Sequence, residues 1–299
     1  MKRDDCDAGD AGEKGNRGRG ISGFIRSLLS GIPWSERGEA TETLTLETPV
    51  SGRLRVDNAN GRTHVIGEDR KDIGIEAVKT ARAESEEGAQ RLVDDIRIVH
   101  REDAQGILEL EVVIPGRIHR QGRADLEIRV PREVWVQVVA ANGRICVEGL
   151  RAKVRARSSN GPVRATDVIG DMDLQAMNAK VQTRCTCGRL LARSSNGKIQ
   201  VEEHQGAVDA STTNGTVTCA LERLGKEGVV LVTSNGRISL DLPDDPDGDL
   251  DVRVDNGVIR SSLDLPAASR ERSGRLKATL GAGGIPIRLR ASNGTITVR

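Results

Sequence analysis

One stretch of the chain decides the architecture, because it carries five copies of the same short unit. Residues 142–215 read NGRICVEGLRAKVRARSSNGPVRATDVIGDMDLQAMNAKVQTRCTCGRLLARSSNGKIQVEEHQGAVDASTTNG, and Asn recurs there at intervals of 18 residues. A fixed period of this kind is typical of one structural unit that is copied and stacked. The sequence therefore predicts a repeat architecture.

The same unit extends beyond this stretch in both directions. It surrounds nine Asn residues, eight of them followed by Gly: Asn60, Asn142, Asn160, Asn178, Asn196, Asn214, Asn235, Asn256 and Asn293. The positions six and four before each Asn, and three and five after it, are mostly aliphatic or small, as with Val136, Val138, Ile145 and Val147 around Asn142. Alternation on both sides of a turn indicates two short, half-buried strands per unit. Asn-Gly suits the turn because both residues tolerate positive φ.

Two architectures fit this pattern, an antiparallel meander and a solenoid. A meander would leave one apolar face uncovered, and no second layer is encoded. A solenoid covers itself, with two sheets facing each other across a thin interior and the Asn side chains stacked as an amide ladder. One Phe, two Trp and no Tyr agree with a narrow interior. We therefore expect an all-β, single-stranded β-solenoid, a parallel β-helix with two sheets and about 18 residues per turn. Asn178, which Ala179 follows, should keep the common corner geometry.

The chain divides into a short tail and a long repeat domain. Residues 1–40 are rich in Gly and charge at their start, which predicts a disordered tail, and residues 41–299 form the solenoid with a helical insert near 83–95. Within the tail, Ile21–Trp34 has apolar residues at helical spacing but is too short to span a bilayer. Three interpretations stay open for it: a cap on the solenoid, a segment that contacts a membrane or partner, and a processing remnant.

Charge and cysteine content place weak limits on the class of partner and on the cellular compartment. Lys and Arg number 45 against 44 Asp and Glu, so the net charge of +1 favours neither nucleic acid nor an acidic partner. No secretory signal is visible. The five cysteines, an odd count, suit a reducing compartment: Cys6, Cys146, Cys185, Cys187 and Cys219. By parity Cys219 points inward and Cys146 outward. We expect the cytoplasm.

Candidate chemistry is sparse, and we predict no catalytic residue, metal site or cofactor. The acidic run from Asp241 to Asp251 could hold calcium, but an EF-hand aligned on Gly248 fails at Pro243 and Val254, so a turn between repeats is favoured. Cys185 and Cys187 have no second pair and give a weak zinc signal. The four His residues share no repeat phase and are expected on the surface: His64, His100, His119 and His204.

A basic stripe is the best binding candidate. Positions two after the Asn carry Arg144, Lys180, Lys198 and Arg237, which stacking would align. This stripe either docks an anionic partner or is ordinary surface solvation. The absence of interleaved aromatics argues against nucleic acid. A polysaccharide lyase or hydrolase on the same frame is the alternative function, although the neighbouring outward positions carry no column of carboxylates.

Several segments of the chain resemble a known family. They are VSGRLRVDNANGRTHVIGED, NGRICVEG, NGPVRATDV, NGKIQVEEHQG, NGTVTC, NGRISLDLP and SNGTITVR, and together they resemble the bacterial adhesin-domain family of unknown function over about residues 41–299. The resemblance implies a β-solenoid without established catalysis, linked in some members to envelope stress or cell-surface roles. We therefore expect a non-catalytic scaffold or binding module. Its partner would be an unknown protein or an anionic polymer, with self-association through unpaired strands at the solenoid ends.

Overall fold

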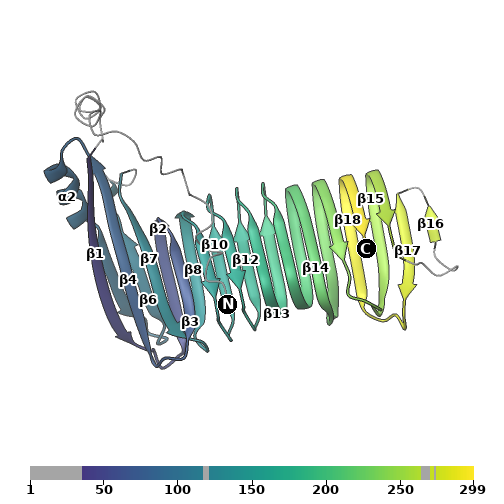
Figure 1. The fold of residues 1–299 in the computed structure, drawn as a ribbon, viewed down its shortest axis with the longest axis horizontal. Helices are drawn as coiled ribbons and strands as arrows, with labels where there is room; N and C mark the ends of the chain where they lie inside the picture. Colours follow the sequence, from purple (N-terminus) through teal and green to yellow (C-terminus); the bar gives the residue numbers. More distant parts are fainter. Residues whose placement is uncertain (1–35, 117–120, 264–269, 273) are drawn as a thin grey trace, which may run out of the picture.

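The described chain winds into one elongated β-solenoid (Figure 1). A computed structural model describes residues 36–116, 121–263, 270–272 and 274–299. Its elements are β1 (Glu36–Glu47), β2 (Arg53–Asn60), β3 (Thr63–Glu68), β4 (Asp72–Ala83), α2 (Glu86–Asp94), β5 (Arg97–Glu102), β6 (Leu108–Val113), β7 (Arg123–Pro131), β8 (Trp135–Asn142), β9 (Ile145–Glu148), β10 (Val154–Ser158), β11 (Val163–Thr166), β12 (Met172–Ala176), β13 (Val181–Ser194), β14 (Ile199–Asp241), β15 (Gly248–Ser261), β16 (Arg270–Arg272), β17 (Arg275–Leu280) and β18 (Pro286–Val298). In the described ranges, no helix has the length and apolar character needed to cross a membrane.

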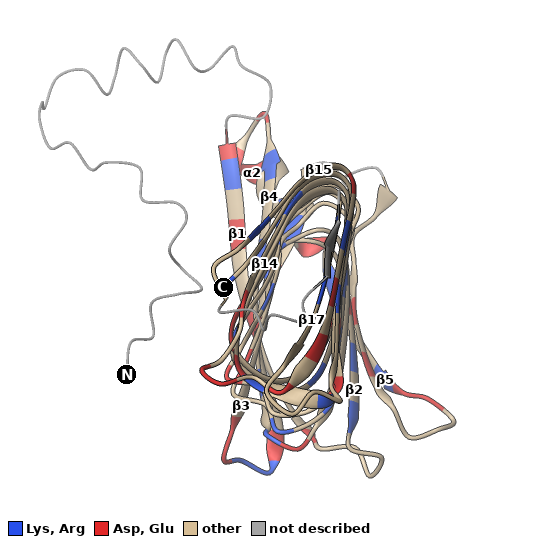
Figure 2. Ribbon diagram, turned by 90° about the vertical axis from the view of Figure 1, so that its right-hand side faces the viewer, with Lys and Arg blue, Asp and Glu red and all other residues tan. Residues whose placement is uncertain are grey.

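Each rung of the solenoid consists of the strand before one Asn and the strand after it. Strands that precede the Asn form the upstream sheet, in which β10 pairs in parallel with β8 and β12. Strands that follow the Asn form the downstream sheet, in which β11 pairs in parallel with β9 and β13. Seen along the long axis, the two sheets enclose a flattened oval (Figure 2). The predicted two-sheet parallel β-solenoid is thus confirmed.

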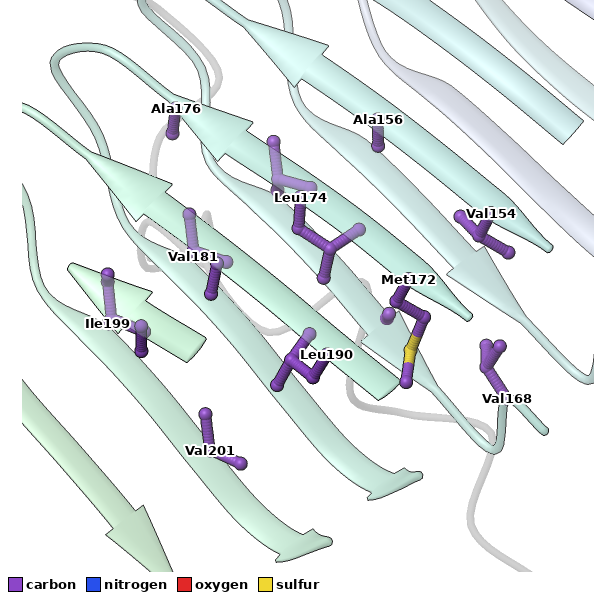
Figure 3. Packing of buried hydrophobic residues seen from close by; sticks show 14 of the residues in the cluster. Val154, Ala156, Val168, Met172, Leu174, Ala176, Val181, Leu190, Ile199 and Val201 are labelled. Carbon is purple, nitrogen blue, oxygen red and sulfur yellow. The ribbon is translucent and has the colours of Figure 1, made fainter. Parts of the chain in front are cut away.

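The interior between the sheets is a single layer of interdigitating aliphatic side chains (Figure 3). At the rung of Asn178, the four inward positions are Met172, Leu174, Val181 and Thr183, and all are buried. Equivalent positions stack on one another in register, as Val154 does between Val136 and Met172. Trp135, the one Phe, Tyr or Trp residue in the described ranges, is partly exposed and does not belong to this core.

The amino-terminal end departs from simple stacking. The rung formed by β2 and β3 pairs directly with the rung of β8 and β9, although 82 residues separate Asn60 from Asn142. The intervening chain lies on the outer side of that first rung, where β6 and β7 form a further parallel rung. Antiparallel strands then extend both sheets, β4 and β1 on the downstream side and β5 on the upstream side.

The helix α2 covers part of this end and lies within the predicted range 83–95. The Ser85 side chain accepts a hydrogen bond from the backbone N–H of Gly88, which caps the first turn. Ala89 and Val93 are buried against β1 and β4. The strand β1 begins at Glu36, five residues before the predicted start of the domain at 41. The predicted segment Ile21–Trp34 lies outside the described residues.

At the opposite end the stack departs from chain order. The last strand, β18, is inserted between β14 and β15, so that Ile287 lies between Val229 and Leu250. The strand β17 then pairs with β15 in antiparallel fashion and closes the upstream sheet, with β16 beside it. The downstream half of β15, residues 256–261, has β18 on one side and no strand of the described chain on the other.

Candidate functional site

The nine repeated Asn residues form one continuous hydrogen-bonded ladder at the corner between the two sheets. In every Asn of the ladder except Asn60, the side-chain Nδ2 donates to the Oδ1 of the Asn on the adjacent rung, at 2.8–3.1 Å between the two atoms. The ladder runs Asn60, Asn142, Asn160, Asn178, Asn196, Asn214, Asn235, Asn293 and Asn256. All eight hydrogen bonds run in the same direction. Asn256 therefore donates to Asn293, and its own Oδ1 is the acceptor group at that end of the ladder.

The Gly that follows eight of the nine Asn residues allows the corners to approach closely. A Cβ placed on Gly161 would lie 1.8 Å from the carbonyl oxygen of Gly143, and one on Gly236 would lie 1.8 Å from that of Gly215. Asn178 keeps the corner geometry although Ala179 follows it. Its backbone N–H donates to the carbonyl of Ser159, and its side chain bonds to both neighbouring Asn residues.

A second row of polar side chains lies beneath the ladder, and our sequence reasoning missed it. The position two before the Asn carries a hydroxyl on several rungs, and each hydroxyl donates to a backbone carbonyl of the adjacent corner at 3.1–3.2 Å: Ser158 to Gly143, Ser194 to Ala179, Thr212 to Gly197 and Thr233 to Gly215. The recurring Ser or Thr in SSNG, TTNG and TSNG was the signal that could have revealed it. These hydroxyls give the corner carbonyls a hydrogen-bond donor from the adjacent rung.

The predicted basic stripe is interrupted. Its four members, Arg144, Lys180, Lys198 and Arg237, occupy one outward column of the downstream sheet. Pro162 separates Arg144 from Lys180, and Thr216 separates Lys198 from Arg237. The structure therefore brings together Lys180 and Lys198, which lie on adjacent rungs next to Val181 and Ile199. Arg62 lies beside Arg144 in the same column, because the residues that follow them, Thr63 and Ile145, are in register. Sequence reasoning missed this residue.

Arg164 completes a group of three cations on successive rungs, which we call the cationic cluster: Arg164, Lys180 and Lys198. Arg164 lies opposite Gln182 and donates to its Oε1 at 3.3 Å. Partial burial lowers the pKa of Lys180, and repulsion from Lys198 and Arg164 lowers it further, against the opposite effect of Glu202. Within the described chain, no cation of this cluster forms an ion pair. The cluster therefore holds an excess of positive charge, which Glu202 offsets only in part.

The second corner of the solenoid carries the CxC pair. Asp167, Cys185 and Glu203 stack at this corner with φ of 50°, 51° and 52°, a left-handed conformation that few non-Gly residues adopt. The Cys185 Sγ donates to Glu203 Oε2 at 2.7 Å, and this hydrogen bond raises the pKa of the Cys185 thiol to about 11. A protonated thiol is a poor nucleophile and metal ligand. In the described residues, no group of three His, Cys, Asp or Glu side chains could hold a metal ion.

One expectation for a single residue was wrong, and another residue is more buried than its direction suggests. His204, expected on the surface, is fully buried, because its register places it in the inward column with Thr186, whose hydroxyl lies 2.9 Å from His204 Nδ1. Cys146 is also buried, although its parity points outward. It lies in register between His64 and Arg164, and long neighbours can cover a short outward side chain. Cys219 is buried in the core, as expected.

The acidic run between β14 and β15 forms turns. Asp247 Oδ1 accepts from the backbone N–H of Ala282 at 2.7 Å, and Asp249 accepts from Gly284 N–H at 3.0 Å and from the Thr279 hydroxyl at 3.1 Å. These carboxylates hold the loop after β17 in place. Asp245 adopts a φ of 50° within the same run.

A charged groove of about 210 Å³ lies on the upstream sheet near the amino-terminal end. Arg101 donates to Glu109 at 2.8 Å, and Arg55 contacts the same carboxylate at 3.4 Å. Burial raises the pKa of Asp57, Arg55 opposes this rise, and Glu111 and Glu109 add to it. The groove consists mainly of surface charges that pair with one another, which is a different arrangement from an acid and a base aimed at a substrate.

The fold and the corner define a class of protein, a two-sheet parallel β-solenoid with a hydrogen-bonded Asn ladder. The chain belongs to the Toastrack DUF4097 family, which matches residues 51–299. The family resemblance seen in the sequence is thus confirmed.

Several solved structures resemble the chain. One is a "putative adhesin" from Parabacteroides merdae ATCC 43184, at 11% identity over 89% of this chain and 97% of that one, with a TM-score of 0.49. A "putative adhesin" from Bacteroides fragilis NCTC 9343 is 12% identical over 87% and 96%, with a TM-score of 0.40. A "Putative lipid binding protein" from Parabacteroides distasonis ATCC 8503 is 10% identical over 88% and 97%, with a TM-score of 0.39. No curated protein matches the chain.

Proposed function

We propose that this protein is a non-catalytic binding module that holds an anionic polymer on the downstream sheet, beside the Asn ladder. The observation that carries this proposal is the cationic cluster, with three cations on successive rungs and no carboxylate paired to them in the described chain. Like charges on neighbouring strands destabilise a sheet. A bound anion would relieve that repulsion.

The chemistry around the cluster suits an oxyanion on a linear chain. Lys ammonium groups are compact point charges with three donors each, and Gln182 and Gln200 lie beside them in the next outward column. The sites repeat along the solenoid axis, so a polymer with regularly spaced acidic groups matches them better than a single small anion. With one Phe, two Trp and no Tyr in the chain, nucleic acid would find few rings on which to stack its bases.

Heparin, an anionic polysaccharide, is the probe that tests the proposal. The Lys180→Ser, Lys198→Ser double variant should elute from a heparin column at lower salt and bind heparin about three- to tenfold more weakly, as expected for two exposed ion contacts. The control is Arg223→Ser with Lys226→Ser, which removes the same charge from exposed positions elsewhere on β14. An equal loss in both double variants would show attraction by overall charge and would contradict the proposal.

A scaffold that assembles end to end is a second candidate. It is supported by the downstream half of β15, residues 256–261, which pairs on one side only in the described chain. Val258 on this edge is 53% exposed. Unpaired edges invite another chain, and natural proteins block them with charge. Light scattering should show a mass that rises with concentration and a monomer after Val258→Lys. A wild-type chain that stays monomeric up to millimolar concentration would rule this candidate out.

We further propose that the protein works in a reducing compartment. All four cysteines in the described residues are free thiols, among them Cys185 at the surface. Disulfides are rare in the cytosol and common outside it. Cell fractionation followed by thiol alkylation should find the protein in the cytosolic fraction with its cysteines reduced. Recovery in the envelope fraction with Cys185 oxidised would contradict this proposal.

A further inference from the structure

A row of arginines crosses the upstream sheet at the end of the solenoid where β18 is inserted. Arg290 on β18 lies opposite Arg253 on β15, which lies opposite Arg275 on β17. We call these three residues the arginine row. All three alternate with buried residues such as Val252 and Leu289, so they point outward, and all three are exposed. Adjacent strands are about 4.8 Å apart, so the row brings three guanidinium groups close together.

A second row of outward residues runs beside the first. Arg288 lies opposite Asp251, which lies opposite Lys277. Asp251 Oδ2 lies 3.0 Å from an Arg275 Nη atom and 3.5 Å from Lys277 Nζ. Partial burial would raise the pKa of Asp251, but the hydrogen bond and charge of Arg275, together with Lys277, hold it below its ordinary value. This one carboxylate is therefore already shared by two cations.

The remaining acids leave the patch strongly positive. Asp255 contacts Arg253 at 3.3 Å on the same strand, with both side chains more than half exposed. Asp249 is engaged by the Thr279 hydroxyl and the Gly284 backbone. Arg288 and Arg290 make no ion pair with any described residue. Of the five cations, three pair with Asp251 or Asp255, and Arg288 and Arg290 have no ion-pair partner among the described residues.

Elsewhere on the same sheet, single arginines pair with an acid on the adjacent rung. Arg193 makes two hydrogen bonds of 2.8 Å to Asp209 on the adjacent rung, and Arg155 pairs with Asp173 at 3.0 Å. The arginine row instead places three arginines directly opposite one another on adjacent strands. Like charges directly opposite one another cost stability in a sheet, and the arginine row does not contact the core. Such an arrangement is typical of a binding surface rather than of a structural device.

We propose that the arginine row binds an anionic polysaccharide that lies across the strands, with successive acidic groups of the chain on successive guanidinium groups. Guanidinium offers paired donors in a plane that match carboxylate and sulfate oxygens. A flat sheet face with a straight row of cations fits a linear polymer better than a compact anion. Figure 2 views the molecule from this end, with β15 and β17 toward the reader. The site is independent of the cationic cluster, which lies on the other sheet.

The test uses heparin oligosaccharides of defined length and the full chain in a Lys180→Ser, Lys198→Ser background. Adding Arg253→Ser and Arg290→Ser should weaken binding about three- to tenfold, as expected for two exposed ion contacts. Arg275 is left intact because it holds Asp251. Binding should also strengthen as the oligosaccharide grows long enough to span three strands, because separate contacts on one chain add.

The controls separate this site from overall charge and from a loss of folding. Arg253→Lys with Arg290→Lys keeps the charge but removes the paired donors, so this variant should bind more weakly than the wild type and more tightly than the Ser variant. The Tm of the Ser variant should stay the same or rise, since repulsion is removed. Unchanged binding, or an equal loss after Arg223→Ser with Lys226→Ser, would overturn the proposal. So would a Ser variant that binds heparin normally but loses binding to phosphatidylserine vesicles, because the partner would then be a membrane surface.

Discussion

At the scale of single residues, the Asn side chain stabilises the corner by bonding to its neighbours on both sides. An amide carries both a donor and an acceptor, so one residue type can repeat along the stack and pair with itself. The same property explains why Asn178 keeps its geometry beside Ala179, since its two ladder bonds do not depend on the Gly. An Asp or a Ser could not extend such a ladder in both directions without changing its protonation or its reach.

Replacing one Asn inside the ladder should cost more than replacing one at its end. Asn178→Ala removes two hydrogen bonds and should lower the free energy of unfolding by about 1–2 kcal/mol, while Asn256→Ala removes one and should cost about half of that. Urea denaturation measures both. The control is Ser195→Ala, which changes an exposed neighbour of the ladder. Equal costs for the two Asn variants would mean that the ladder bonds contribute little.

His204 should make stability depend on pH. Burial lowers its pKa, and the nearby backbone of Ala207 and Gly188 opposes this only in part; its Nε2 has no hydrogen-bond partner. Because the folded pKa lies below the unfolded value of about 6.5, the unfolded chain takes up the proton first. Stability is therefore full above pH 7 and falls as pH drops through 6.5.

The variant His204→Leu isolates this contribution, because Leu fills similar space and does not titrate. Thermal unfolding from pH 7.5 to pH 5 should show a smaller loss of Tm for the variant than for the wild type. Identical pH profiles would show that His204 is not protonated more readily in the unfolded chain. The part of the Tm loss that arises from other titrating groups should be the same in the wild type and in the variant.

At the scale of the elements, the corner between two strands depends on the hydroxyl row beneath the ladder. Ser158 donates to the Gly143 carbonyl and accepts from the Gly161 N–H, so it links one corner to the next. Ser158→Ala should lower the free energy of unfolding by about 1–3 kcal/mol, because it leaves a buried carbonyl unpaired. Ser159→Ala, at the more exposed neighbouring position, is the matched control and should cost less than about 0.5 kcal/mol.

A loss of similar size in the Ser158→Ala and Ser159→Ala variants would contradict this account. Ala176 occupies the same position as Ser158 on the next rung, which shows that a corner can form without the hydroxyl. The hydroxyl row therefore adds stability to a corner that the Asn and the backbone already define.

The strands and their inward faces could be predicted from the sequence, because each depends on a local pattern. The alternation around Asn142 and Asn178 gives strand direction, parity and spacing without any knowledge of distant contacts. The insertion of β18 could not be predicted in this way. Asn256 and Asn293 have the same frame, so either rung fits beside the rung of Asn235, and the choice depends on the connecting loops and on β17.

The residues of the candidate site also divide into those that the sequence predicts and those that it does not. The 18-residue period alone predicts that Lys180 and Lys198 lie side by side, and the strands have that register. The importance of Arg164 depends on a diagonal contact between two columns, and the arginine row depends on the inserted strand and on the antiparallel β17. His204 shows the limit most clearly, because a polar residue in an inward column has no local signature that distinguishes it from a surface residue.

At the scale of the whole molecule, a stack of rungs should respond to damage locally. Leu289 is fully buried between Leu231 and Val252. Leu289→Ala should cost about 2–4 kcal/mol. Because each rung contacts only its neighbours, hydrogen exchange should accelerate in β15, in β18 and in the part of β14 that pairs with β18, while β8 to β12 stay protected. The matched change is Leu54→Ala near the other end. A uniform acceleration along the chain would show one cooperative unit instead.

The position of β18 also has a consequence for the order in which the chain assembles. Residues 286–298 are synthesised after both of their neighbours, yet they lie between them. A solenoid that simply grew rung by rung behind the ribosome would close β15 onto β14 first and leave no gap for the last strand. Assembly at this end must therefore wait, with the rung of Asn256 held apart or released again, until the final segment arrives. This end of the solenoid is thus completed by a strand that enters between two rungs, and not by a rung added at its outer edge.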